Sequence, residues 1–241
     1  MYLKKYFFLS DLDNFKNLSL LKFFIYSFVL IPILLVTGPF LSDLVLSLSS
    51  LFFIFFSIKK KIFREYFLNK FFIFFILFWI YILIGSIFSE HTLLSLESSL
   101  FYFRFACFSI LAYFLFFNFE ILKKLSFFIL IITFVILIFD GFFEFIFQYN
   151  IIGFQRADVN RLSSFFRDEL ILGSYLVRFL PFIVFLYLSN KFDSKYDNYF
   201  LFFIFLSGIL IFLSGERASF LLFILFYISY MLISKKFGKK L

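Results

Sequence analysis

The sequence has 241 residues, of which 63% are hydrophobic and 16% are charged, and its mean hydropathy is +1.04. This composition excludes an ordinary soluble globular protein and predicts an all-α polytopic membrane protein. Although the net charge is +8, the basic residues are spread over short segments between apolar runs, so we expect no nucleic acid partner.

Eight apolar segments in the sequence are long enough to be transmembrane helices, because crossing a hydrocarbon core about 30 Å thick takes about 20 residues. The sequence therefore predicts one transmembrane domain over residues 1–241, in which residues 148–169 form the main loop on the outer side. Pro32 and Pro181 fall inside two of these helices and predict local kinks. The helices are expected near residues 21–38, 41–58, 71–88, 99–117, 126–147, 170–189, 199–213 and 217–233.

Lysine sets the expected orientation of these helices. The lysines gather in the two terminal regions and in segments 59–70, 118–125 and 190–198, which alternate onto one side if all eight helices cross. Loops rich in lysine stay in the cytoplasm. Both termini are therefore expected in the cytoplasm, with the helices in contact with membrane lipid.

The arginines follow a different pattern. Only Arg64 lies in a lysine-rich segment, whereas four arginines fall on the opposite, outer side and two fall inside predicted helices. A positive residue on the outer side works against the insertion bias, so these arginines need another role. The outer ones are Arg156, Arg161, Arg167 and Arg217, and the ones inside helices are Arg104 and Arg178.

Two of the arginines are expected below the outer membrane boundary. At 1.5 Å per residue, Arg104 lies about 8 Å deep and Arg178 about 12 Å deep, if their helices begin where hydropathy places them. A charge in the bilayer costs at least about 2.5–3.5 kcal/mol and should face a partner or a polar cavity. We expect an outward-facing pocket in which both arginines pair with the acids at the outer end of the fifth helix, Asp140 and Glu144. The alternative is that both side chains reach up to the headgroups.

The turn from Ser214 to Ser219 is expected to dip into the outer interface, because the two helices that it joins are at the short end of what can span a membrane. The turn would carry Glu216 and Arg217 toward the polar pocket. Alternatively, these two side chains cap the hairpin and reach the lipid headgroups.

Cysteine and histidine give no sign of a metal or redox site. Cys107 lies inside an apolar run and is expected to be a packing residue. The single histidine, His91, has no second ligand with which to share a metal. The sequence has no Gly-rich phosphate loop, nucleophile elbow or HExxH motif. We therefore expect no metal and no cofactor.

Three short motifs occur in order on this background. They are Thr37-Gly38-Pro39 in the turn of the opening hairpin, then Arg161-Leu162-Ser163-Ser164-Phe165-Phe166 followed by a membrane helix from Gly173 through Pro181, and finally Leu213-Ser214-Gly215-Glu216-Arg217-Ala218-Ser219. In this combination the sequence resembles the O-antigen ligase and polymerase family of the bacterial inner membrane.

The resemblance implies a multi-pass membrane glycosyltransferase of lipopolysaccharide biosynthesis that acts on the periplasmic face without a metal. It also implies that the main loop on the outer side, residues 148–169, is the main periplasmic loop. Its members transfer a glycan from undecaprenyl pyrophosphate to lipid A core or to another glycan acceptor, and arginines bind the leaving pyrophosphate. Arg161 and Arg217 match the family's motif arginines, so the expected catalytic residues are these two and Glu216. The expected binding residues for the pyrophosphate and the glycan are Arg104, Arg156, Arg167, Arg178, Asp140 and Glu144.

The sequence departs from the family pattern in two places. Glu216 stands where the family more often has serine, and it is placed to pair with Arg217. Relatives also continue past this hairpin into a large periplasmic loop, with a histidine thought to activate the acceptor, and into further helices. The chain thus covers roughly the N-terminal half to two thirds of the family pattern, as expected of a fragment, of the first part of a split gene or of a degenerate copy.

Two functions of other kinds stay open at this point. A flippase or transporter for a lipid-linked anion would also use arginines inside the membrane, but it should carry inverted repeats and broken helices near the midplane. A non-catalytic membrane assembly subunit is the other alternative.

Overall fold

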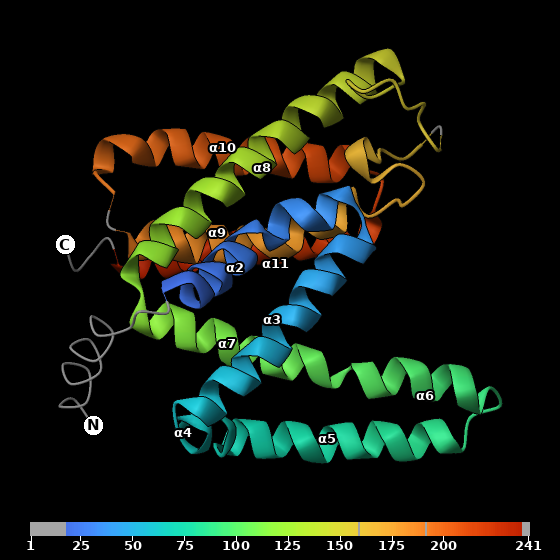
Figure 1. Ribbon diagram of the computed structural model, residues 1–241. Helices are drawn as coiled ribbons and strands as arrows, with labels where there is room; N and C mark the ends of the chain where they lie inside the picture. The colour runs from blue at the N-terminus through green and yellow to red at the C-terminus, as the bar shows by residue number, and fades with distance from the viewer. Residues whose placement is uncertain (1–17, 159, 191, 238–241) are drawn as a thin grey trace. The chain divides into compact units, whose positions relative to one another are not determined.

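The computed structural model describes residues 18–158, 160–190 and 192–237 (Figure 1). In these ranges the chain is helical, and its only β-type pairings are two isolated bridges, between Tyr149 and Gln155 and between Asp158 and Arg161. The prediction of an all-α polytopic membrane protein is therefore confirmed.

Each apolar segment that was expected to be a transmembrane helix contains a helix of the structure. These helices are α2 (Leu18–Thr37), α3 (Pro39–Lys59), α5 (Lys70–Ile87), α7 (Phe103–Asn118), α8 (Glu120–Phe147), α9 (Leu172–Ser189), α10 (Asp197–Leu213) and α11 (Arg217–Phe237). Four shorter elements lie between them, namely α4 (Phe63–Phe67), α6 (Thr92–Phe101) and the 3-10 helices η1 (Ser164–Phe166) and η2 (Ser194–Tyr196).

Six helical segments are long and apolar enough to cross a membrane, counting α6 and α7 as one segment. Within the described residues, two further apolar helices are shorter, Lys22–Thr37 and Arg217–Leu232. The chain is thus a multi-pass membrane protein, and the number of eight crossings stays a prediction.

Two helical segments begin six or more residues earlier than hydropathy predicts. The helix expected from residue 99 already begins at Thr92, with a short interruption at Tyr102, and the helix expected from residue 126 begins at Glu120. Both early turns are rich in polar residues, such as Ser95 and Lys123. Hydropathy marks the apolar part of a helix, whereas the backbone hydrogen bonds that define the helix continue through polar residues.

Contacts within the chain divide it into two compact units, a division that hydropathy does not reveal. The first unit contains residues 42–119 and the part of α2 that precedes Pro32. Figure 1 shows α5 and α6 side by side in this unit. The Trp79 indole donates a hydrogen bond to the Ser99 carbonyl at 2.8 Å, and the hydroxyls of Ser86 and Ser99 are also hydrogen-bonded. Polar side chains thus join α6 to the apolar helix α5.

Phenylalanine makes the core of the first unit. Phe24, Phe53, Phe67 and Phe114 are buried almost completely, and the ring centroids of Phe53 and Phe114 lie 5.3 Å apart. Such tilted aromatic pairs stabilise a core beyond the area that they bury. These rings therefore act in packing, as does Cys107, which is fully buried.

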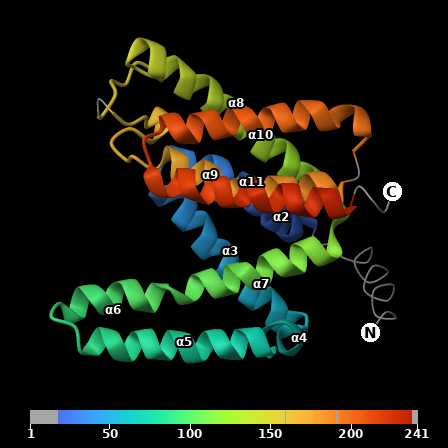
Figure 2. The same ribbon diagram turned by 180° about the vertical axis from the view of Figure 1, so that it is seen from behind.

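The second unit contains residues 32–41 and the chain from Glu120 onward. Its helix α9 contacts α8, α10 and α11 (Figure 2). A Cβ added at Gly141 of α8 would lie 2.6 Å from Leu210 Cδ1 of α10, so a larger residue there would displace the Leu210 side chain from this close helix packing. The arginine-rich loop after α8 and the turn before α11 belong to this unit.

Candidate anion-binding site

The loop between α8 and α9 is attached to two buried carboxylates. Asp140 and Glu144 lie one turn apart on α8 and are 0% and 1% exposed. Asp140 accepts hydrogen bonds from the Ile151 N–H at 2.8 Å and from the Ser164 hydroxyl. Glu144 accepts from the N–H groups of Ser163 at 3.3 Å and Ser164 at 2.6 Å. The two acids thus fix both an early and a late part of the loop to α8.

A third carboxylate, that of Glu216, binds the N-terminus of α9. It accepts hydrogen bonds from the N–H groups of Gly173 at 2.7 Å and Ser174 at 3.0 Å, and from the Ser219 hydroxyl at 2.8 Å. The first N–H groups of a helix have no partner in their own helix and carry partial positive charge. Glu216 therefore caps α9 from the neighbouring hairpin, and it forms no ion pair with Arg217 in the described part of the chain.

The turn between α10 and α11 lies directly against the loop. Gly215 has φ +73°, and a Cβ added there would lie 2.7 Å from the Asn160 carbonyl oxygen and 3.0 Å from Arg161 Cγ. Only glycine permits both this conformation and this approach without strain. The segments that carry Arg161 and Arg217, far apart in sequence, therefore meet at one end of the second unit.

Two arginines of the loop bind neutral acceptors. Arg161 Nη2 donates to the Leu170 carbonyl at 3.0 Å, and its buried Nε has no hydrogen-bond partner among the described residues. Arg156 donates from Nε to the Arg161 carbonyl at 3.1 Å and from Nη1 to Gln148 Oε1 at 3.1 Å. Carbonyl and amide oxygens orient these guanidinium groups without neutralising them.

The other three arginines of the second unit are exposed. The Arg167 guanidinium lies over the Phe154 ring, 4.4 Å from its centroid, while Arg178 and Arg217 project from α9 and from the first residue of α11. In the part of the chain that the structure describes, no arginine of this unit has a carboxylate oxygen within 4.0 Å. The nearby acids Asp140, Glu144 and Glu216 instead bind backbone N–H groups.

Arg104 pairs with Asp43 of α3, which corrects the expectation that it meets Asp140 or Glu144. Arg104 Nη2 lies 2.8 Å from Asp43 Oδ2, and Nη1 donates to the Ser47 hydroxyl at 3.3 Å. Because the helical segment begins at Thr92 rather than near residue 99, Arg104 also lies deeper along it than predicted.

The prediction of a pocket of paired charges among the fourth, fifth and sixth helices is therefore wrong. Arg178 is exposed and has no acidic partner among the described residues, and Asp140 and Glu144 are occupied by the loop. Sequence reasoning missed Asp43. The available signal was that Asp43 is the only acid of α3, a helix of apolar and serine residues, since a lone charge in a membrane helix needs a partner.

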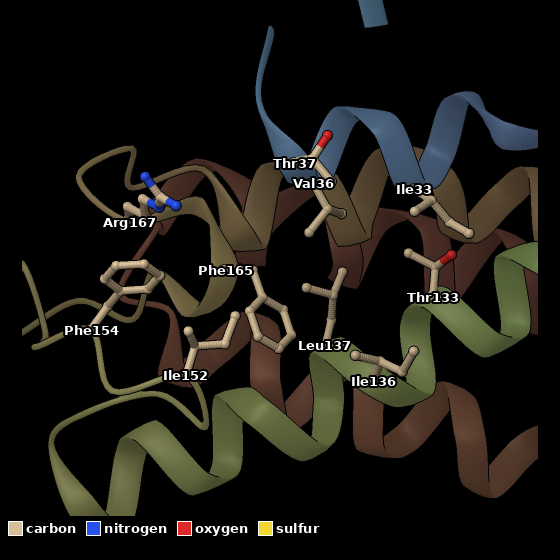
Figure 3. Close-up of a pocket in the computed structure, with 10 residues that line it drawn as sticks. All are labelled: Ile33, Val36, Thr37, Thr133, Ile136, Leu137, Ile152, Phe154, Phe165 and Arg167. Atoms are coloured by element: carbon tan, nitrogen blue, oxygen red, sulfur yellow. The ribbon is translucent and has the colours of Figure 1, made fainter. Parts of the chain in front are cut away.

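A cavity of about 340 Å³ opens beside the loop within the second unit. Figure 3 shows Arg167 and Phe154 at one end of its lining and Ile33 and Thr133 at the other. The lining comes from the end of α2, from α8 and from the loop. Arg167 lines this cavity, and Arg161 and Arg217 do not, so a cavity shared by those two residues stays a prediction.

Among the described residues, no group of three or more His, Cys, Asp or Glu side chains is placed to hold a metal ion. Comparisons with protein-family models, with curated proteins and with solved structures find no match. This end of the second unit gathers guanidinium groups that form no ion pair with a described carboxylate, next to an apolar cavity, in a membrane protein.

Proposed function

We propose that the protein is a membrane glycosyltransferase, or the N-terminal part of one, that transfers a glycan from undecaprenyl pyrophosphate to lipid A core or another glycan acceptor. The proposal starts from the resemblance of the sequence to O-antigen ligases and polymerases. It also assigns the protein to the bacterial inner membrane, with the arginine-bearing loop on the periplasmic face.

The proposal rests on the partners of the charged side chains at one end of the second unit, where the loop after α8 meets the turn before α11. We call this the arginine end. Among the described residues, five arginines lack a carboxylate within ion-pair distance. Asp140, Glu144 and Glu216 bind backbone N–H groups, and the loop's own acids Asp158, Asp168 and Glu169 form no ion pair with these arginines. A guanidinium group that no carboxylate contacts keeps N–H donors available for an anionic ligand. Guanidinium groups bind phosphate oxygens through two parallel hydrogen bonds.

The chemistry places negative charge where arginine stabilises it. An acceptor hydroxyl oxygen forms a bond to the anomeric carbon, and the carbon–oxygen bond to the pyrophosphate breaks. The electron pair goes to the pyrophosphate oxygen, and the hydroxyl proton leaves to solvent. Arg161, which the Leu170 carbonyl orients, and Arg217, on the adjoining turn, act as donors to that oxygen, because fixed donors stabilise developing charge strongly.

The test is the replacement of Arg161 or Arg217 by lysine, which keeps the charge and removes the fork of two donors. Each charge-assisted hydrogen bond contributes about 1.5–3 kcal/mol, so we expect each variant to lose at least about tenfold in glycan transfer. The assay uses membranes that contain the full-length protein, the lipid-linked glycan and the acceptor. Arg64→Lys, at an exposed position in α4, is the matched control.

Near-normal transfer by both Arg161→Lys and Arg217→Lys would show that paired donation is not used. Absence of transfer by the unaltered full-length protein, with donor and acceptor supplied, would remove the enzyme proposal. Movement of the lipid-linked glycan across the membrane in that experiment would identify a flippase instead.

A further inference from the structure

The cavity beside Arg167 has the character of a site for an amphiphile. Of the ten side chains that line it, seven are apolar, and the polar ones are Thr37, Thr133 and Arg167. Arg167 lies at one end of the lining, with the apolar side chains of α2 and α8 beyond it (Figure 3). An apolar chamber with one cation at its end matches a molecule that has an apolar chain and an anionic head.

The backbone at Arg167 gives a second, independent indication. Its φ is 56° and its ψ is −116°, and the Glu169 N–H donates to the Phe166 carbonyl at 3.1 Å. These values and this hydrogen bond match the first central position of a type II′ turn, where glycine, asparagine and aspartate are the usual residues. A side chain in this conformation costs about 1–3 kcal/mol. An arginine at this position therefore favours a role for its side chain over a role in the turn.

The Arg167 side chain is oriented by a ring rather than neutralised by an acid. Its guanidinium lies over Phe154, which also lines the cavity, at 4.4 Å from the ring centroid. Cation–π stacking holds the guanidinium plane while leaving its N–H groups free to donate at the edge. No carboxylate lies within ion-pair distance of Arg167 in the described chain.

We propose that this cavity binds the apolar chain of an isoprenoid phosphate, next to its head, and that Arg167 binds the phosphate attached to that chain. This inference rests on the proposed function, because it assigns the lipid carrier of that reaction to a site. At about 340 Å³ the cavity is at the small end of ligand sites. It therefore holds only the chain segment that adjoins the phosphate, and the remainder of a long carrier lies in the bilayer.

The experiment measures binding of radiolabelled geranylgeranyl pyrophosphate to the full-length protein in detergent. Geranylgeraniol, inorganic pyrophosphate and phosphatidylglycerol are the competitors. Effective competition only by unlabelled geranylgeranyl pyrophosphate is the expected result, since the site needs both the chain and the phosphate. Equal competition by any of the other three compounds would overturn the proposal. Competition by geranylgeraniol would indicate an apolar groove, competition by pyrophosphate a simple anion site, and competition by phosphatidylglycerol a site for bulk lipid.

Two variants locate the binding. Arg167→Gly removes the guanidinium while giving the turn its preferred residue, so it should fold at least as well as the unaltered protein and bind about tenfold or more weakly. Val36→Trp fills the cavity from α2 and should also weaken binding. The controls are Arg64→Gln, which removes an exposed charge, and Leu30→Trp, which adds the same bulk to α2 at an exposed position outside the cavity. Unchanged binding by Arg167→Gly or by Val36→Trp would remove the site.

Measuring both lipid binding and glycan transfer in these variants tests this inference separately from the proposed function. Glycan transfer that persists undiminished in Val36→Trp would overturn the cavity assignment and leave the glycosyltransferase standing. Binding of geranylgeranyl pyrophosphate that is lost in both variants, in a protein without transfer activity, would support the lipid site and remove the enzyme.

Discussion

At the scale of single residues, the structure shows that unsatisfied backbone groups, rather than opposite charge, decide where three of the acids bind. The first N–H groups of α9 and those of the loop need acceptors, and Glu216, Asp140 and Glu144 supply them. A carboxylate that accepts several N–H bonds is as well stabilised as one in an ion pair. Counting charges along the sequence therefore gave wrong partners for these acids.

Arg104 and Asp43, by contrast, do form an ion pair, as expected for opposite charges within membrane helices. We expect Asp43→Asn to lower the free energy of unfolding by about 1–3 kcal/mol, because it leaves a guanidinium in the membrane without a carboxylate. The double variant Asp43→Asn/Arg104→Gln should be more stable than Asp43→Asn, since removing both charges costs less than stranding one. Thermal unfolding in detergent measures both effects.

The control for this pair is Glu97→Gln, which neutralises an exposed acid of α6 and should leave stability unchanged. A double variant that is less stable than Asp43→Asn alone would contradict the pairing.

At the scale of elements, hydropathy predicted the apolar segments well because the pattern depends only on local composition. The start of α8 differed by six residues, from the predicted 126 to Glu120, because polar residues such as Lys123 extend the helix. The type II′ turn at Arg167 and the interruption at Tyr102 carry no glycine or proline that would have signalled them. The sequence shows Asp43 as a lone acid that needs a partner, but it does not show that this partner is Arg104, 61 residues away.

The element that most affects the candidate site is the loop between α8 and α9, which Asp140 and Glu144 hold in place. We expect Asp140→Asn and Glu144→Gln each to increase the rate of amide exchange over residues 150–166, because each turns an acceptor oxygen into a donor amide facing an N–H or hydroxyl. Loss of one such charge-assisted bond corresponds to about a tenfold or larger increase. Hydrogen–deuterium exchange measured by mass spectrometry follows this loop directly.

The matched control is Asp168→Asn, which removes an exposed acid of the same loop and should not change the exchange rate. If Glu144→Gln exchanged no faster than Asp168→Asn, the carboxylates would not be what holds the loop. The loop sets the positions of Arg156, Arg161 and Arg167. Asp140→Asn and Glu144→Gln should therefore reduce glycan transfer only by displacing these arginines.

At the scale of the second unit, lysines gather at one end of the helices and most arginines gather at the other. The Asn190 side chain at the end of α9 donates to the Lys123 carbonyl near the start of α8 at 3.3 Å, which joins the lysine-bearing ends of these helices. At the other end, Gly215 of the turn meets Asn160 and Arg161 of the loop. Helices α8 to α11 thus place lysines at one end and all but one of the unit's arginines at the other, with Arg178 within α9. Loop lysines favour the cytoplasm, so the arginine end is predicted to face outward.

This orientation can be tested with single cysteines, because the native Cys107 is buried and its replacement by alanine gives a background without accessible thiols. We expect a membrane-impermeant maleimide to label Asp168→Cys at the arginine end in intact spheroplasts. Lys195→Cys at the lysine end should be labelled only after the membrane is permeabilised. Both positions are exposed in the structure, so a difference in labelling reports the side of the membrane rather than burial. Labelling of Lys195→Cys in intact spheroplasts, with Asp168→Cys protected, would invert the topology, and the arginines would then face the cytoplasm, away from any periplasmic glycan.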